Sequence, residues 1–130
     1  MAKKVEKIEL ALPFKAEYVS VARLTASGIA ARMGFDIESV EDIKVALSEV
    51  CNKLVSAGSK SSDRYVIDFI IHSSKIEILI NFEDRRLAGL FGTNGDELGI
   101  SIIEALMDTF KVSTDDSNTL SMSKEIKGKI

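Results

Sequence analysis

The chain has 130 residues, of which 45% are hydrophobic and 28% charged, and its net charge is -3. This composition excludes a disordered chain and predicts one globular domain over residues 1–130. The charge gives no argument for direct nucleic-acid binding, because lysines and arginines are spread along the chain.

Apolar runs fall short of the roughly 20 residues that a membrane span needs. The N-terminal segment MAKKVEKIEL lacks the apolar core of a signal peptide. Cys51 is the single cysteine, and there is no CxxC, HExxH or histidine cluster. We therefore expect a cytoplasmic protein without a membrane span, an internal disulfide or a zinc site.

The first two elements follow from local patterns. Residues 5–12 alternate apolar and polar side chains, which predicts a strand that ends at Pro13. Residues 17–33 are rich in small side chains at helical spacing and predict a helix that ends before Gly34. The buried stripe expected for this helix consists of Ala22, Ala26, Ile29, Ala30 and Met33.

Residues 39–55 predict a second helix with a clear apolar stripe. Ser39 with Asp42 resembles a capping box at its start. The residues expected to face the core are Val40, Ile43, Leu47, Val50 and Leu54.

Residues 64–72 and 75–82 are rich in β-formers and are separated by two serines, which predicts an antiparallel hairpin. The charged and then glycine-rich segment 83–95 predicts a mobile loop.

A third helix is predicted over residues 96–110, followed by a hairpin formed by 111–114 and 118–126. The inward side chains expected for this helix are Leu98, Ile102, Ala105, Leu106 and Phe110. The order of elements predicts an α+β two-layer sandwich, with a mixed, mostly antiparallel sheet and helices on one face.

The second helix carries the most informative polar residues. Glu49 precedes Asn52 by three positions and Lys53 by four, so the three side chains are neighbours on the helix surface. Glu49 could act as a general base, and the Asn52 carbonyl could bind Mg²⁺, which prefers oxygen ligands. Alternatively, Glu49 and Lys53 form a simple ion pair between residues four apart, which stabilises a helix by about 0.2–0.5 kcal/mol.

Four glycines precede or open the third helix, and backbone N–H groups at a helix start can hold phosphate. They are Gly89, Gly92, Gly95 and Gly99. Their spacing matches neither GxGxxG nor a P-loop. Asp96 and Glu97 complement the helix dipole there but would repel a phosphate.

Other chemically active side chains have simple interpretations. His72 lies at a strand end without a carboxylate placed beside it by sequence, which favours a surface or capping role. Cys51 lies near the apolar stripe and is expected to be a small buried hydrophobe. Arg85 and Arg86 follow an acid in the loop and are expected to be solvated.

Three segments in order resemble the bacterial anti-sigma-factor serine kinases of the sporulation and general-stress circuits. They read LPFKAEYVSVARLTASGIAARMGF, VEDIKVALSEVCN and LGISIIEALMD. These kinases belong to the GHKL, or Bergerat-fold, histidine-kinase-like ATPases. The resemblance covers most of the chain and is more specific for the kinases than for GHKL ATPases in general.

The resemblance implies a sandwich that holds Mg-ATP between its helices and its sheet. It also implies a homodimer that binds a sigma factor and phosphorylates a serine of a small anti-anti-sigma protein. By the same match Glu49 is the catalytic glutamate and Arg23 contacts a partner. Gly99, with Gly95 before it, lies in the second glycine box, and Ser123 matches a threonine near the adenine pocket.

The sequence departs from the family pattern at the magnesium ligand. The family places its asparagine four residues after the glutamate, where this chain has Lys53, and Asn52 falls one residue early. A protonated lysine cannot bind Mg²⁺, and it would pair with Glu49. Asn52 could serve as the magnesium ligand only after a local shift.

Two further nucleotide elements are altered. Phe82 occupies the place of the adenine-binding aspartate in an ungapped match, and Asp84 reaches that place only by a shift. Asp96 and Glu97 replace the paired glycines before Leu98. Phosphate binding depends on several donors acting together.

Three hypotheses remain open from the sequence. The chain could be a kinase-like regulator that still binds ATP through Asp84 and Asn52. It could be an inactive relative that keeps only its partner-binding surfaces. It could also have a purely structural role in a larger complex.

Overall fold

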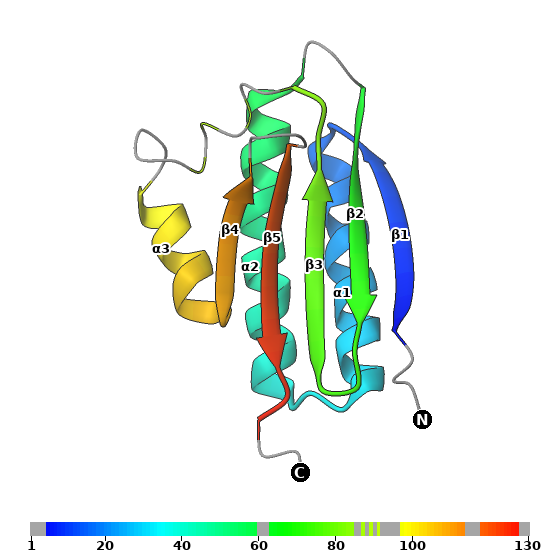
Figure 1. Ribbon diagram of the computed structural model, residues 1–130. Coiled ribbons are helices and arrows are strands. Elements are labelled where there is room, and N and C mark those ends of the chain that lie inside the picture. Colours follow the sequence, from blue (N-terminus) through cyan, green and yellow to red (C-terminus); the bar gives the residue numbers. More distant parts are fainter. Residues whose placement is uncertain are drawn as a thin grey trace.

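The computed structural model describes residues 5–59, 63–84, 87, 89, 91, 97–113 and 118–127. Five strands form one sheet in the order β1-β2-β3-β5-β4 (Figure 1). The strands are β1 (Glu6–Pro13), β2 (Arg64–Ile71), β3 (Lys75–Asn81), β4 (Thr109–Ser113) and β5 (Thr119–Glu125). All four pairings between these strands are antiparallel. The sequence predicted a mixed, mostly antiparallel sheet; the described sheet is entirely antiparallel.

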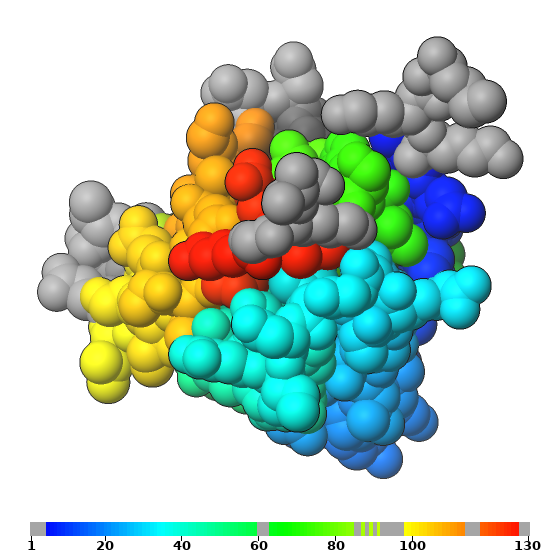
Figure 2. Space-filling model, turned by 90° about the horizontal axis from the view of Figure 1, so that it is seen from below, coloured from blue at the N-terminus to red at the C-terminus, as the bar shows by residue number. Residues whose placement is uncertain are grey.

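The helices lie on one face of this sheet, which confirms the two-layer sandwich (Figure 1). They are η1 (Ala16–Tyr18), α1 (Val19–Met33), α2 (Ile37–Ala57) and α3 (Glu97–Leu106). α1 and α2 pack side by side, and α3 flanks α2 on its other side. Viewed from below, the start of α2 lies under β5, with α3 beside both (Figure 2). None of the described helices combines the length and the apolar character needed to cross a membrane.

The core lies between the sheet and the helices. Alternate strand residues such as Phe69 and Ile78 are fully buried against the apolar stripe of α2, which includes Leu47 and Leu54. Burying such a side chain contributes about 1.5–3 kcal/mol relative to exposing it. The hairpin 64–82 and the predicted stripe of α2 are therefore confirmed.

Polar side chains form a ladder across the other face of the sheet, which carries no helix among the described residues. Lys7 Nζ lies 3.8 Å from Asp68 Oδ2, and Asn81 Nδ2 donates to the same carboxylate oxygen at 3.1 Å. The hydroxyl of Thr119 donates in turn to Asn81 Oδ1 at 3.0 Å. The ladder crosses β1, β2, β3 and β5, and helps to fix their register, because a one-residue slip would turn these side chains to the other face.

The junction between α1 and α2 corrects one prediction. Gly34 ends α1 with φ of 100°, a left-handed conformation that glycine adopts without strain. Asp36, rather than Ser39, caps α2: its carboxylate accepts a hydrogen bond from the backbone N–H of Ser39 at 2.7 Å. Ser39 therefore lies inside the first turn, and the helix begins at Ile37.

The Asp36 cap makes the stability depend on pH. The hydrogen bond from the Ser39 backbone holds the pKa of Asp36 below its ordinary value of 3.8. The cap therefore contributes its full stabilisation above the ordinary pKa and loses it as the pH falls through the lower folded pKa. We expect Asp36→Ala to lower the urea midpoint at neutral pH, and the difference from the wild type to shrink in strong acid. Glu38→Ala, in the same helical turn but not at the cap, is the control; an equal loss in that variant would contradict the assignment.

The third helix differs from its prediction. α3 ends at Leu106, and Phe110 lies in β4, where it pairs with Met122 of β5. Leu98 is 72% exposed, whereas Ile103 and Met107 are buried, so the inward face is shifted by one residue. Pairing with β5 thus outweighs the helical periodicity of this segment.

Two other predictions change with the tertiary structure. His72 Nε2 lies 2.5 Å from the Glu77 carboxylate across the hairpin, a partner that the sequence did not indicate. In the segment 83–95, Leu87 and Phe91 are buried in the core, which a charged loop did not predict. Arg85 and Arg86 lie outside the described residues.

Candidate functional site

The side chains singled out on α2 have different environments. Glu49 and Lys53 are half-buried and one helical turn apart, while Asn52 is exposed. Because residues four apart stack on one helix face, Lys53 occupies the place beside Glu49 where the family pattern requires an amide oxygen.

A groove of about 380 Å³ runs between α1 and α2 and brings Arg23 and Glu49 onto one surface. These two residues are 26 positions apart in the sequence, and the side-by-side packing of the two helices places them together. The groove is lined by Ser20, Arg23, Leu24, Glu41, Lys44, Val45, Ser48 and Glu49.

Local contacts order the α2 wall of the groove. Lys44 Nζ lies 3.0 Å from the Glu41 carboxylate, and the Ser48 hydroxyl donates to the Lys44 carbonyl at 2.8 Å. The wall therefore presents charges of both signs at fixed positions, next to the Glu49 carboxylate.

Two apolar side chains of the groove are exposed, and neither belongs to a stripe that the sequence predicted. Leu24 of α1 is 70% exposed and Val45 of α2 is 43% exposed. Exposed apolar side chains rimmed by charges are typical of protein–protein contacts. Leu24 could have been found from the sequence, because it interrupts the polar face of a helix whose buried stripe is already complete.

The residues expected around adenine lie beyond the end of β3. Phe82 is buried in the core cluster, so an apolar ring fills the position of the family's aspartate. Asp84 is also buried, and its carbonyl accepts a hydrogen bond from the Leu87 N–H at 3.0 Å. Gly99 is buried in α3, and Gly95 lies outside the described residues.

Ser123 lies on the polar face of the sheet. Its neighbour Met122 packs in the core against the helices, and alternate residues of a strand point to opposite faces. The Ser123 hydroxyl lies 2.7 Å from the hydroxyl of Thr109 on β4. The structure therefore separates Ser123 from the helical layer that carries Glu49.

These side chains do not fit magnesium and adenine as the family pattern arranges them. The position four residues after Glu49 offers an ammonium group rather than an oxygen, and Phe82 offers no carboxylate to adenine. Over the described part of the chain, no three His, Cys, Asp or Glu side chains form a group that could hold a metal ion. Of the oxygen-bearing residues Glu49, Asn52 and Asp84, Glu49 lines the groove between α1 and α2, and the other two do not.

Cys51 of α2 is buried in the core, which confirms its prediction as a buried residue. Burial raises the pKa of its thiol to about 12 and, with Cys51 beside it, also raises the pKa of Tyr65. The thiol therefore stays protonated at neutral pH, and the thiolate is the reactive form.

We expect Cys51 to react with Ellman's reagent at least about 100-fold more slowly in the native protein than in denaturant. The absorbance of the released thiolate follows the reaction. Equal rates in the two states would contradict the buried, protonated thiol.

Comparisons with known proteins identify the family of this chain. The family model described as "Histidine kinase-like ATPase domain" matches residues 12–124. The chain is 34% identical to the "Serine-protein kinase RsbW" of Bacillus cereus (strain AH820), over 98% of this chain and 89% of the relative. It is also 34% identical, with the same coverage, to RsbW of Bacillus mycoides (strain KBAB4).

A solved structure supports the fold alone. The crystal structure of the RsbU and RsbW domains of a Mycobacterium tuberculosis protein superposes with a TM-score of 0.71 at 17% identity. The match covers 93% of this chain and 32% of that longer chain. The chain therefore belongs to the histidine kinase-like ATPase domain family and, within it, to the serine-kinase family that its sequence motifs predicted.

Proposed function

We propose that this protein is an anti-sigma-factor regulator of the serine-kinase type, which binds a sigma factor, a small anti-anti-sigma protein, or both. It acts in the cytoplasm as a homodimer, as the resemblance implies. Partner binding, rather than phosphoryl transfer, is its principal activity. Its relatives are serine-protein kinases, and the altered magnesium and adenine positions distinguish it from their pattern.

The observation that carries this proposal is the groove between α1 and α2. It combines Arg23, which the resemblance assigns to partner contact, with the exposed Leu24 and Val45. Arginine is one of the side chains that carry most of the binding energy in protein interfaces, and exposed apolar side chains beside it favour a contact with another protein. The lysine at position 53 is not among the residues that line the groove.

ATP-dependent phosphorylation is the second candidate, and the retained Glu49 favours it. In that case Glu49, at the edge of the groove, would accept the proton of a serine hydroxyl on the docked partner. Asp84 and Asn52 would then have to contact the nucleotide, and Lys53 would oppose metal binding beside Glu49.

Two measurements separate these candidates. We expect calorimetry to show no saturable, Mg²⁺-dependent ATP binding up to millimolar nucleotide, while immobilised protein binds a candidate sigma factor or anti-anti-sigma protein without nucleotide. Mg²⁺-dependent micromolar ATP binding, together with phosphate transfer to the anti-anti-sigma protein, would favour the second candidate. Failure to bind every candidate partner, with or without ATP, would contradict the proposed function.

Lys53→Asn tests whether the lysine is the cause of the expected loss of ATP binding. If ATP binding appears in this variant, the lysine alone blocks the magnesium site; if it does not, Phe82 and the segment before α3 are also responsible.

A further inference from the structure

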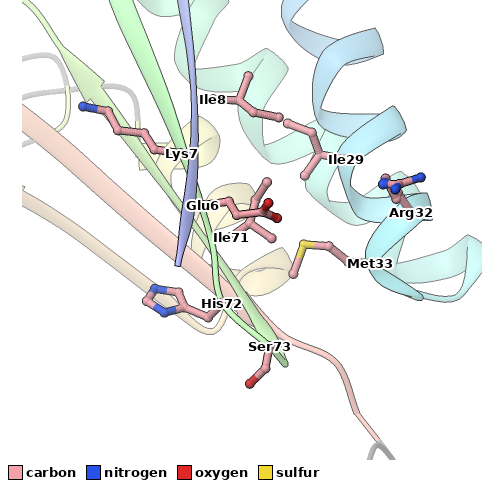
Figure 3. Close-up of a pocket in the computed structure, with 9 residues that line it drawn as sticks. All are labelled: Glu6, Lys7, Ile8, Ile29, Arg32, Met33, Ile71, His72 and Ser73. Carbon is pink, nitrogen blue, oxygen red and sulfur yellow. The ribbon is translucent and has the colours of Figure 1, made fainter. Parts of the chain in front are cut away.

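A cavity of about 490 Å³ lies between the start of β1 and the last turns of α1 (Figure 3). Its apolar part is formed by Ile8, Ile29, Met33 and Ile71. Ile8 lies on the face of β1 that points to the helices, yet it is 41% exposed, so this corner of the sandwich is incompletely filled. Cavities of about 300–1,000 Å³ that combine apolar walls with a few polar groups are typical of small-molecule sites.

An acidic residue occupies an inward-facing position of β1 at this cavity. Alternate residues of a strand share one face, so Glu6 follows Leu12, Leu10 and Ile8 on the face that meets the helices. Glu6 is exposed, and its side chain points toward α1 (Figure 3). The β1 wall of the cavity therefore carries a negative charge.

The opposite wall carries a positive charge. Arg32 lies in the last turn of α1, lines the cavity and is exposed. Within the described part of the chain, neither Glu6 nor Arg32 forms an ion pair. The two charges therefore lie at the same cavity without neutralising each other.

Two further basic side chains line the cavity but are directed elsewhere. Lys7 and His72 point away from α1, toward the other face of the sheet (Figure 3). Lys7 Nζ lies 3.8 Å from Asp68 Oδ2, and His72 Nε2 contacts the Glu77 carboxylate. The charged groups left to meet a ligand in the cavity are thus one carboxylate and one guanidinium.

This pair of groups selects a ligand that carries both charges. A guanidinium binds a carboxylate through two parallel hydrogen bonds, and an ammonium group has three hydrogens to donate to a carboxylate. A fatty acid would be repelled by Glu6, and an alkylamine would be repelled by Arg32. The apolar walls add the requirement for an apolar body, which gains free energy when it leaves water.

We propose that this cavity binds a free α-amino acid with a large apolar side chain, such as leucine, methionine or phenylalanine. Its ammonium group contacts Glu6, its carboxylate contacts Arg32, and its side chain lies against Ile29 and Met33. The cavity shares no lining residue with the partner groove between α1 and α2. The inference therefore goes beyond the proposed function, and its tests require neither a sigma factor nor an anti-anti-sigma protein.

Calorimetric titration of the full chain with matched ligands tests the chemical class. We expect L-leucine to bind with a Kd of about 0.1 mM. It should bind at least about tenfold more tightly than 4-methylpentanoate, which lacks the ammonium group, and than isopentylamine, which lacks the carboxylate. Glycine lacks the apolar side chain and should also bind at least about tenfold more weakly. Equal affinities for leucine and 4-methylpentanoate would overturn the proposal, since the ammonium group would then contribute nothing.

Substitution of the two charged residues should remove the two preferences separately. In Glu6→Gln, leucine should lose its advantage over 4-methylpentanoate and keep its advantage over isopentylamine, and Arg32→Gln should show the reverse. Lys7→Gln is the matched control, because Lys7 lines the cavity but points away from α1, and it should bind leucine as the wild type does. All three side chains are exposed, so we expect the variants to fold, and circular dichroism checks this.

Nuclear magnetic resonance locates the bound amino acid. Leucine should shift the methyl signals of Ile29 and Met33 and leave those of Val45, in the partner groove, unchanged. The absence of saturable binding of leucine, methionine and phenylalanine up to about 10 mM would overturn the proposal. Unchanged leucine affinity in both Glu6→Gln and Arg32→Gln would overturn it as well. Leucine binding by a chain that binds none of the candidate partners would reject the proposed function and leave this site intact.

Discussion

Charge reversal at Arg23 is expected to weaken partner binding by about 30-fold or more, the effect of losing an arginine at the centre of an interface. Arg23 is exposed and lines the groove between α1 and α2 together with Leu24 and Glu49. Because the side chain is exposed, Arg23→Glu should leave the free energy of unfolding within about 0.5 kcal/mol of the wild type. Surface plasmon resonance with the bound partner measures the affinity, and urea unfolding measures the stability.

The control for Arg23→Glu is a variant that reverses the charge of a cation outside the groove. Lys111→Glu alters an exposed cation of β4, a strand that does not line the groove. Leu24→Ala should also weaken binding while it preserves the charge, since it removes the most exposed apolar side chain of the groove. If Lys111→Glu weakened binding as much as Arg23→Glu, net charge rather than the groove would account for the effect.

Lys124→Ala should lower the free energy of unfolding by about 2–3 kcal/mol. The lysine side chain is 8% exposed; its Nζ donates to the Leu106 carbonyl at 2.6 Å and lies 3.8 Å from the Asp42 carboxylate. It thus connects the end of α3 to β5 and to α2. Removing it leaves a carbonyl at a helix end without its donor and leaves a void in the space of the aliphatic stem.

Urea unfolding followed by circular dichroism measures this loss, and amide exchange shows where it occurs. Exchange in α3 should accelerate more than exchange in β1, which does not pair with the strand that carries Lys124. Lys127→Ala removes an exposed lysine from the segment that follows β5 and should change the stability by less than about 0.5 kcal/mol. Equal losses in the two variants would show that the buried contacts of Lys124 contribute nothing.

Elements with a strong period could be predicted from the sequence. The stripe of α2 and the alternation of β2 and β3 are each long enough to identify the element and its buried face. α3 is shorter, with a strand directly after it, and its apolar residues fit two neighbouring faces equally well. Only packing decided between them, because Ile103 rather than Leu98 meets the core.

Contacts between distant residues could not be predicted in the same way. His72 and Glu77 meet because the hairpin register brings them together, and periodicity does not give that register. Arg23 and Glu49 could each be named from the motifs of the family, but the groove that joins them depends on how α1 lies against α2. Leu87 and Phe91 are buried although their segment is charged and glycine-rich, because their burial depends on core residues that are distant in the sequence.

The place of β5 in the sheet has a consequence for the order of folding. β5 follows every other strand in the chain, yet it lies between β3 and β4, and β4 pairs with no other described strand. The helical pair α1–α2 and the β2–β3 hairpin can form from local contacts as soon as they are synthesised, whereas β4 must wait for the strand behind it. During translation the α3–β4 half of the molecule therefore remains open until β5 has left the ribosome, and this half is the one in which exposed strand edges would be most vulnerable to aggregation.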